Sequence, residues 1–202
     1  MSEDRRIYQG HVERNRDVIL HVLDRFVPED GHVLEIASGT GQHAWYYAKQ
    51  RPGWTWQPTE PDADRCHRAD AWLEAEPLPN LRPAAVVDVT APWQLERATY
   101  DIVFNANMVH ISPWATCEGL MRGASEYLTE DGKLIMYGPF KVGGEHTAPS
   151  NSAFSERLQS QDPAWGVRDL EAVIETADRF GLGLDERIQM PANNFTLVFG
   201  RR

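Results

Sequence analysis

The sequence has few cysteines, few basic side chains relative to acidic ones, and no long apolar run. The two cysteines, Cys66 and Cys117, lack the close spacing of a zinc site, so we predict no metal centre. Against 30 Asp and Glu there are only 20 Lys and Arg, without a basic cluster, which argues against nucleic acid as a partner. No stretch approaches the ~18 apolar residues of a membrane span, and no apolar signal segment follows the N-terminus. We therefore predict a cytoplasmic protein with no membrane partner.

Predicted strands and helices alternate along the chain. Apolar spacing predicts helices over residues 15–26, 42–50, 64–74, 114–128 and 169–180. Short apolar runs predict strands over residues 32–37, 55–58, 85–89, 100–108, 133–137, 184–190 and 195–199. The Gly- and Pro-containing segment 138–152 is predicted to be a loop over the open end of the sheet. This alternation predicts an α/β fold with a mostly parallel sheet and right-handed crossovers.

The chain shows no sign of a second domain. Its 202 residues suffice for one core without disulfides, and no repeat or linker interrupts them. We predict a single domain over residues 1–202, with a core over 31–202. The remaining segment, 1–30, is predicted either to cover a cofactor as a lid or to pack as an ordinary helix.

A glycine-bearing turn follows the first predicted strand and precedes a helix. Glycine allows positive φ and close approach of the backbone to a ligand, and a helix N-terminus offers free N–H groups. A Gly-x-Gly turn alone is weak evidence, but this position between strand and helix strengthens it. We predict a cofactor site that includes Ala37, Ser38, Gly39, Gly41 and His43.

Acidic residues occur at three consecutive predicted strands. Glu60 follows about 20 residues after the turn, where an acid binds the ribose hydroxyls in Rossmann-type sites. Asp88, with Val89 beside it, ends the third strand and is predicted to reach the adenine or the pocket edge. Each acid alone could be a solvated loop carboxylate. Together with Glu35 they indicate one acidic crevice, because these strand ends meet.

The charge of this site distinguishes two cofactors. NAD sites use Gly-x-Gly-x-x-Gly to approach a pyrophosphate, and here Ala44 occupies the third glycine position. S-adenosylmethionine carries a sulfonium and an ammonium and no phosphate, so an acid at Glu35 suits it better. No basic residue follows the turn before Lys49. We therefore predict S-adenosylmethionine, with S-adenosylhomocysteine as product, and keep a NAD-dependent oxidoreductase as an alternative.

Several longer motifs resemble one family. They are VLEIASGTGQHA, WTWQPTEPD, YDIVFNANMVHISPW, YGPF, WGVRDLE and MPANN, spread over nearly the whole chain. They are similar to those of the methyltransferase-like protein 26 family, a class I methyltransferase-like group. The resemblance implies a Rossmann-like, mostly parallel seven-stranded sheet with an antiparallel last strand and helices on both faces. It also implies S-adenosylmethionine as cofactor, bound at Glu35, Gly39, Gly41, Glu60 and Asp88. The superfamily's usual first glycine of the turn is Ala37 here.

The residues that act on the methyl acceptor are predicted from their places after the fourth and fifth strands. Methyl transfer mainly needs alignment and exclusion of water, and a general base only where the acceptor loses a proton. His110 has a pKa near neutrality and is one candidate base, although it could instead cap the next helix. Asn107 and Tyr137 are the other catalytic candidates, and Asn105 is expected to contact the cofactor. Predicted acceptor contacts are Phe140, Trp165, Arg168, Asn193 and Asn194.

The sequence thus predicts an S-adenosylmethionine-dependent methyltransferase with a small-molecule acceptor. A catalytically silent scaffold or sensor of the cofactor is an alternative, because fold alone does not establish activity. A nucleic-acid methyltransferase is disfavoured by the net charge of −10 and by the absence of an Asn/Asp-Pro-Pro-aromatic tetrad. The acceptor and the oligomeric state do not follow from the sequence.

Overall fold

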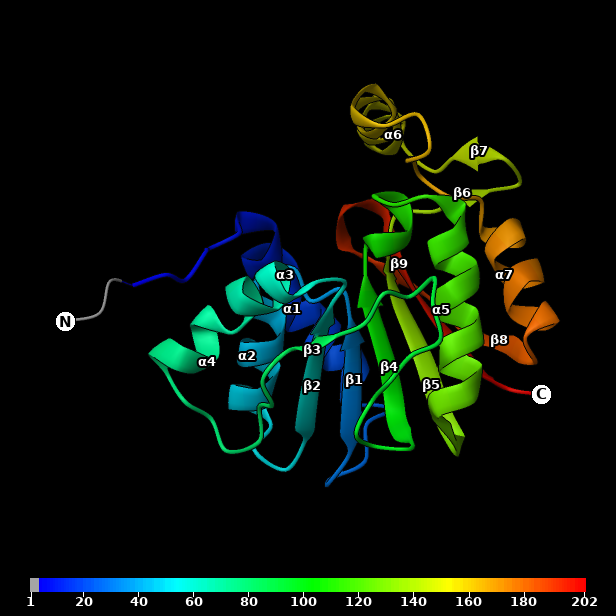
Figure 1. The fold of residues 1–202 in the computed structure, drawn as a ribbon. Helices are drawn as coiled ribbons and strands as arrows, with labels where there is room; N and C mark the ends of the chain where they lie inside the picture. The colour runs from blue at the N-terminus through cyan, green and yellow to red at the C-terminus, as the bar shows by residue number, and fades with distance from the viewer. Residues whose placement is uncertain (1–3) are drawn as a thin grey trace.

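The architecture is a seven-stranded sheet in the order β3-β2-β1-β4-β5-β9-β8 (Figure 1). The computed structural model describes residues 4–202, so residues 1–3 of the predicted N-terminal segment lie outside the described residues. Strand β9 pairs antiparallel with both β5 and β8, and the other pairs are parallel, which confirms the predicted sheet. The strands are β1 His32–Ile36, β2 Thr55–Glu60, β3 Ala85–Val86, β4 Tyr100–Ala106, β5 Leu128–Gly138, β8 Leu182–Met190 and β9 Asn194–Arg201.

Helices cover both faces of the sheet, and one buried cluster lies on each side. Successive residues of β4 alternate between the clusters: Ile102 and Phe104 belong to one, and Val103 to the other. Both faces of the central strands are therefore apolar, as parallel sheets require. The first cluster includes α1 (Gly10–Leu23) and α2 (Gln42–Gln50), and the second includes α5 (Trp114–Tyr127) and α7 (Leu170–Arg179).

Strand β2 is longer than its sequence predicts, because Pro58 does not end it. A strand proline costs a ladder hydrogen bond from its missing N–H. Here the Nε2 of Gln57 donates to the Pro83 carbonyl at 2.8 Å beside the proline, and Thr59 resumes the pairing with β3. Glu60 is therefore the last residue of the strand.

Two predicted helices also differ from the structure. The first begins earlier than expected, at Gly10, so α1 includes much of the predicted lid segment. The helix predicted over 64–74 is broken into α3 (Ala63–Ala69) and α4 (Ala71–Ala75). At the break, the side chain of Asp70 accepts a hydrogen bond from the Ala84 N–H at 2.7 Å, which ties it to the segment before β3.

The segment after β5 is structured, and the prediction of a loop over 138–152 is wrong in part. It forms the hairpin of β6 (Lys141–Val142) and β7 (Glu145–His146), followed by α6 (Pro149–Gln161). Proline is well tolerated in the first turn of a helix, so Pro149 starts α6 rather than preventing it. Figure 1 shows α6 and the hairpin beyond the end of the sheet to which β5 leads. Within residues 4–202, no helix combines the length and apolarity needed to cross a membrane.

Candidate functional site

The turn after β1 has three residues with left-handed backbone. Ala37 has a φ of 57°, Gly39 of 65° and Gly41 of 76°. Ala37 adopts this conformation at a cost of roughly 1–2 kcal/mol relative to right-handed backbone. A Cβ on Gly39 would meet nothing within 4 Å, whereas one on Gly41 would lie 2.2 Å from the carbonyl oxygen of Ala69 in α3. Gly39 therefore leaves open space for a ligand, and Gly41 allows the turn to pack on α3.

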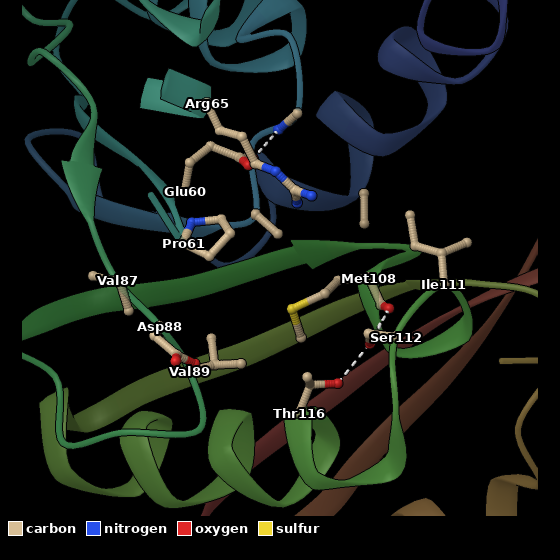
Figure 2. A pocket seen from close by; sticks show the side chains of 13 residues that line it. Glu60, Pro61, Arg65, Val87, Asp88, Val89, Met108, Ile111, Ser112 and Thr116 are labelled. Atoms are coloured by element: carbon tan, nitrogen blue, oxygen red, sulfur yellow. Dashed lines mark hydrogen bonds between the residues drawn. The ribbon is translucent and has the colours of Figure 1, made fainter. Parts of the chain in front are cut away.

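A cavity of about 310 Å³ opens at this turn, between the carboxyl ends of β1 and β4 (Figure 2). This is the point of an α/β sheet where the strand order reverses and where ligands bind. Its volume lies at the lower end of the ~300–1,000 Å³ typical of small-molecule pockets. We call it the first cavity; it is lined by Ala37, Gly39, Glu60, Pro61, Arg65, Val87, Asp88, Val89, Ala106, Met108, Ile111, Ser112 and Thr116.

Two acids give the first cavity its hydrogen-bonding character. Glu60 accepts a short hydrogen bond from the Gly39 N–H with one oxygen, Oε1, and burial raises the pKa of its carboxyl. Asp88 accepts from the N–H and hydroxyl of Thr90, which lower its pKa. Arg65 brings one positive charge to the lining (Figure 2). Glu60 is thus fixed against the glycine turn while its second oxygen, Oε2, has no such bond within residues 4–202.

Five of the predicted cofactor residues line the first cavity: Ala37, Gly39, Glu60, Asp88 and Val89. The other five, Glu35, Ser38, Gly41, His43 and Asn105, are not in its lining.

Three of these five, Glu35, Ser38 and Asn105, support the turn from behind, whereas Gly41 belongs to the turn and His43 bonds to Asn15 of α1. Glu35 is only 2% exposed, accepts a hydrogen bond from Nε1 of Trp56 at 2.8 Å, and has its pKa raised by burial to about 7. The Ser38 hydroxyl accepts from the Thr59 N–H, and Asn105 donates to the Ile36 carbonyl. Together these bonds tie the turn to β2 and β4.

A second cavity, of about 570 Å³, adjoins the first. Ile111 lines both of them. The walls come from α1, from the ends of β4 and β5, from α6 and from the segment between β8 and β9. We call it the second cavity; it is lined by His11, Arg14, Asn15, Val18, Asn107, Ile111, Tyr137, Pro139, Asn151, Phe154, Arg157, Pro191, Ala192 and Asn194.

Of the residues predicted to act on the acceptor, Asn107, Tyr137 and Asn194 line the second cavity. Asn107 begins the short helical turn Met108–His110 with a φ of 65°. Burial raises the pKa of Tyr137 above its ordinary value, and the nearby Asn15 opposes this rise only in part.

The structure does not bring His110 to either cavity. Its side chain is fully buried, packs edge-on against Phe140 at 4.8 Å between ring centroids, and has its pKa lowered by burial to about 3. Its backbone carbonyl accepts from the Gly166 N–H. The histidine therefore joins the segment after β4 to the segment before α7, and its position does not support a role as general base.

The remaining predicted acceptor contacts also lie outside the cavity linings. Phe140 is fully buried in the core. Arg168 donates to the carbonyls of Val109, Ser112 and Ala164, so its guanidinium holds two loops together. Asn193 is exposed, and its carbonyl accepts from Asn151. Trp165 is half-buried beside these segments.

Sequence reasoning missed two groups of lining residues. Met108 and Ser112 of the first cavity follow β4 before α5 begins, and the rule that ligands bind at carboxyl strand ends would have indicated them; Thr116 lies in the first turn of α5. Asn151, Phe154 and Arg157 lie on α6, in and beyond the stretch predicted as a loop, where no strand end marked them. Within residues 4–202, no group of three or more His, Cys, Asp or Glu side chains is placed to hold a metal ion.

The fold is that of Rossmann-like class I methyltransferases, as its structural neighbours show. An O-methyltransferase family protein from Burkholderia thailandensis aligns with a TM-score of 0.77 and 16% identity, over 95% of this chain and 56% of that one. A TehB-like methyltransferase from Corynebacterium glutamicum aligns with a TM-score of 0.64 and 16% identity, over 96% and 97%. The pyocyanin biosynthetic protein PhzM aligns with a TM-score of 0.74 and 14% identity, over 92% and 55%. The chain thus spans about half the length of the first solved structures it matches.

The family follows from the sequence itself. A family model described as "Protein of unknown function (DUF938)" matches residues 6–201. The chain belongs to this family.

Proposed function

We propose that the protein is an S-adenosylmethionine-dependent methyltransferase with a small-molecule acceptor. The observation that carries the proposal is the first cavity, where Gly39 leaves space for a ligand beside a carboxylate at the end of β2. The second oxygen of Glu60 suits a ribose hydroxyl, and Asp88 suits a cofactor amino group. Gly39, Glu60 and Asp88 would hold the cofactor, which when bound supplies a methyl carbon activated by its sulfonium.

The second cavity supports methyl transfer over silent binding of the cofactor. It shares Ile111 with the first cavity, so a molecule in each would meet near this side chain. A bound cofactor would supply the methyl group, and the residues of the second cavity would hold the acceptor in line with it. Tyr137 is protonated near neutral pH, as a tyrosine whose pKa is raised must be, and would donate a hydrogen bond that orients the acceptor.

Calorimetry with S-adenosylmethionine, S-adenosylhomocysteine and NAD tests the cofactor. We expect both adenosyl ligands to bind and NAD not to bind. Glu60→Gln should weaken binding of S-adenosylhomocysteine by roughly 1–3 kcal/mol, because a charge-assisted hydrogen bond to ribose is lost. Asp64→Asn is the matched control, since Asp64 is exposed in the first turn of α3 and lies outside the lining. Binding of NAD alone, or equal affinity in Glu60→Gln, would contradict the proposed site.

Transfer itself is tested with a labelled methyl donor and a small-molecule extract. Transfer of the label into small molecules would support methyltransferase activity. Tight binding of S-adenosylhomocysteine without any transfer would favour the silent sensor.

A further inference from the structure

The charge of the second cavity is opposite to that of the protein. The chain carries a net charge of −10, yet the lining contains Arg14 and Arg157 and no Asp or Glu. The first cavity, in contrast, is lined by two carboxylates and one arginine. A cavity whose charged lining residues are cationic attracts an anion.

The two arginines are available to a ligand. Within residues 4–202, neither forms an ion pair, whereas Arg25, Arg51 and Arg202 each bind an acid. The guanidinium of Arg157 lies over the ring of Phe154, with 5.2 Å between its carbon and the ring centroid. This stacking leaves the N–H groups at the guanidinium edge, where they can bind a carboxylate in a bidentate way.

Neutral hydrogen-bond donors in the lining of the second cavity also favour an anion. Nε2 of His43 lies 2.8 Å from Oδ1 of Asn15, which can only accept, so this nitrogen carries the proton. The Asn15 amide nitrogen then remains to donate to a ligand. The Tyr137 hydroxyl also lines this cavity and can donate its proton towards a ligand oxygen.

Part of the remaining wall of the second cavity is apolar. Phe154, Pro139, Pro191 and Val18 lie among the lining residues and suit a hydrophobic body. We propose that the methyl acceptor of this cavity is a small organic acid, with an apolar body against these side chains and a carboxylate held by Arg14 and Arg157. This inference rests on the proposed function, because it assigns the second cavity to the acceptor.

The test compares acids with their uncharged amides of the same shape. A panel of pairs, such as benzoate and benzamide, phenylacetate and phenylacetamide, and indole-3-acetate and its amide, is titrated into the protein loaded with S-adenosylhomocysteine. We expect acids to bind at least about tenfold more tightly than their amides, as charge-assisted hydrogen bonds imply. Equal binding of amides, or no binding by any acid, overturns the inference.

Substitutions test whether Arg14 and Arg157 cause the preference for acids. The double substitution Arg14→Gln with Arg157→Gln should remove the preference for acids while leaving the affinity for S-adenosylhomocysteine unchanged. Arg82→Gln is the matched control, an exposed arginine that lines a different cavity and should retain the preference. A preference that survives the double substitution, or is lost in the control, overturns the assignment to these arginines. Failure of S-adenosylhomocysteine to bind the unmodified protein would instead contradict the proposed function.

Discussion

Ala37, Gly39 and Gly41 in the turn after β1 all have left-handed backbone, but the surroundings of the three residues differ. Gly41 needs its missing Cβ because the Ala69 carbonyl occupies that space, whereas the space beside Gly39 is empty. Ala37 has the same backbone conformation with a Cβ present. The sequence indicates that this turn binds a ligand, but it does not distinguish these surroundings, because glycine spacing reports backbone conformation and not what lies opposite each Cα.

At the residue scale, Gly39→Ala should abolish or strongly weaken cofactor binding. The added methyl group would enter the first cavity, and the left-handed backbone would cost about 1 kcal/mol of stability. Gly143→Ala is a matched control, since Gly143 has a φ of 60° and also nothing within 4 Å of its Cβ position. Both variants should lose similar stability in urea unfolding, and only Gly39→Ala should lose at least about tenfold in affinity for S-adenosylhomocysteine, about 1.4 kcal/mol. Equal affinity in both would remove Gly39 from the site.

At the element scale, strands were predicted better than the segments that connect them. The apolar run of β4 is buried on both faces, so its position follows from hydrophobicity alone. Strand β2 extends past Pro58 because a neighbouring glutamine supplies a donor, a contact that spans 26 residues and leaves no local signal. Helix α6 has a weakly apolar face and follows a glycine-containing hairpin, so the local pattern resembled a loop.

The contact between the turn and α3 gives a prediction of its own. Gly41→Ala should destabilise the fold by more than the left-handed cost, by about 2–4 kcal/mol, because its Cβ would overlap the Ala69 carbonyl and force α3 away from α2. Urea unfolding at pH 8 measures this loss, with Gly143→Ala as the reference for backbone strain alone. If the two variants are equally stable, the close packing of the turn on α3 is not needed for the fold.

At the scale of the whole molecule, the net charge of the chain is opposite in sign to the charge of the second cavity. An acidic chain gives no indication of a cationic cavity, because its lining comes from segments about residues 11–18, 151–157 and 191–194, far apart in sequence. The crevice of the first cavity, in contrast, follows from topology, since consecutive strand ends meet at one edge of the sheet. This difference explains why five of the residues predicted to bind a cofactor line the first cavity, while only three of those predicted to act on the acceptor line the second.

Buried titratable groups distributed over the molecule predict how its stability depends on pH. Burial lowers the pKa of His43 and His110 to about 3, and raises that of Glu35 to about 7. The histidines contribute stability that is complete above their unfolded pKa, near 6.5, and is lost as the pH falls towards 3. Glu35 acts in the opposite direction between pH 7 and 4.5, because the folded protein then binds a proton that the unfolded chain does not.

Two histidines outweigh one glutamate, so the free energy of unfolding should fall by about 1.4 kcal/mol per pH unit near pH 5.5. Glu35→Gln keeps an acceptor for the Trp56 N–H and removes the opposing proton. Its unfolding free energy should therefore fall about twice as steeply between pH 6 and 5, and should exceed that of the unmodified protein at pH 8, where the buried carboxylate is charged. Urea unfolding from pH 5 to 8 measures both curves. An equal slope in the two proteins would mean that Glu35 is already ionised in the folded protein between pH 5 and 6.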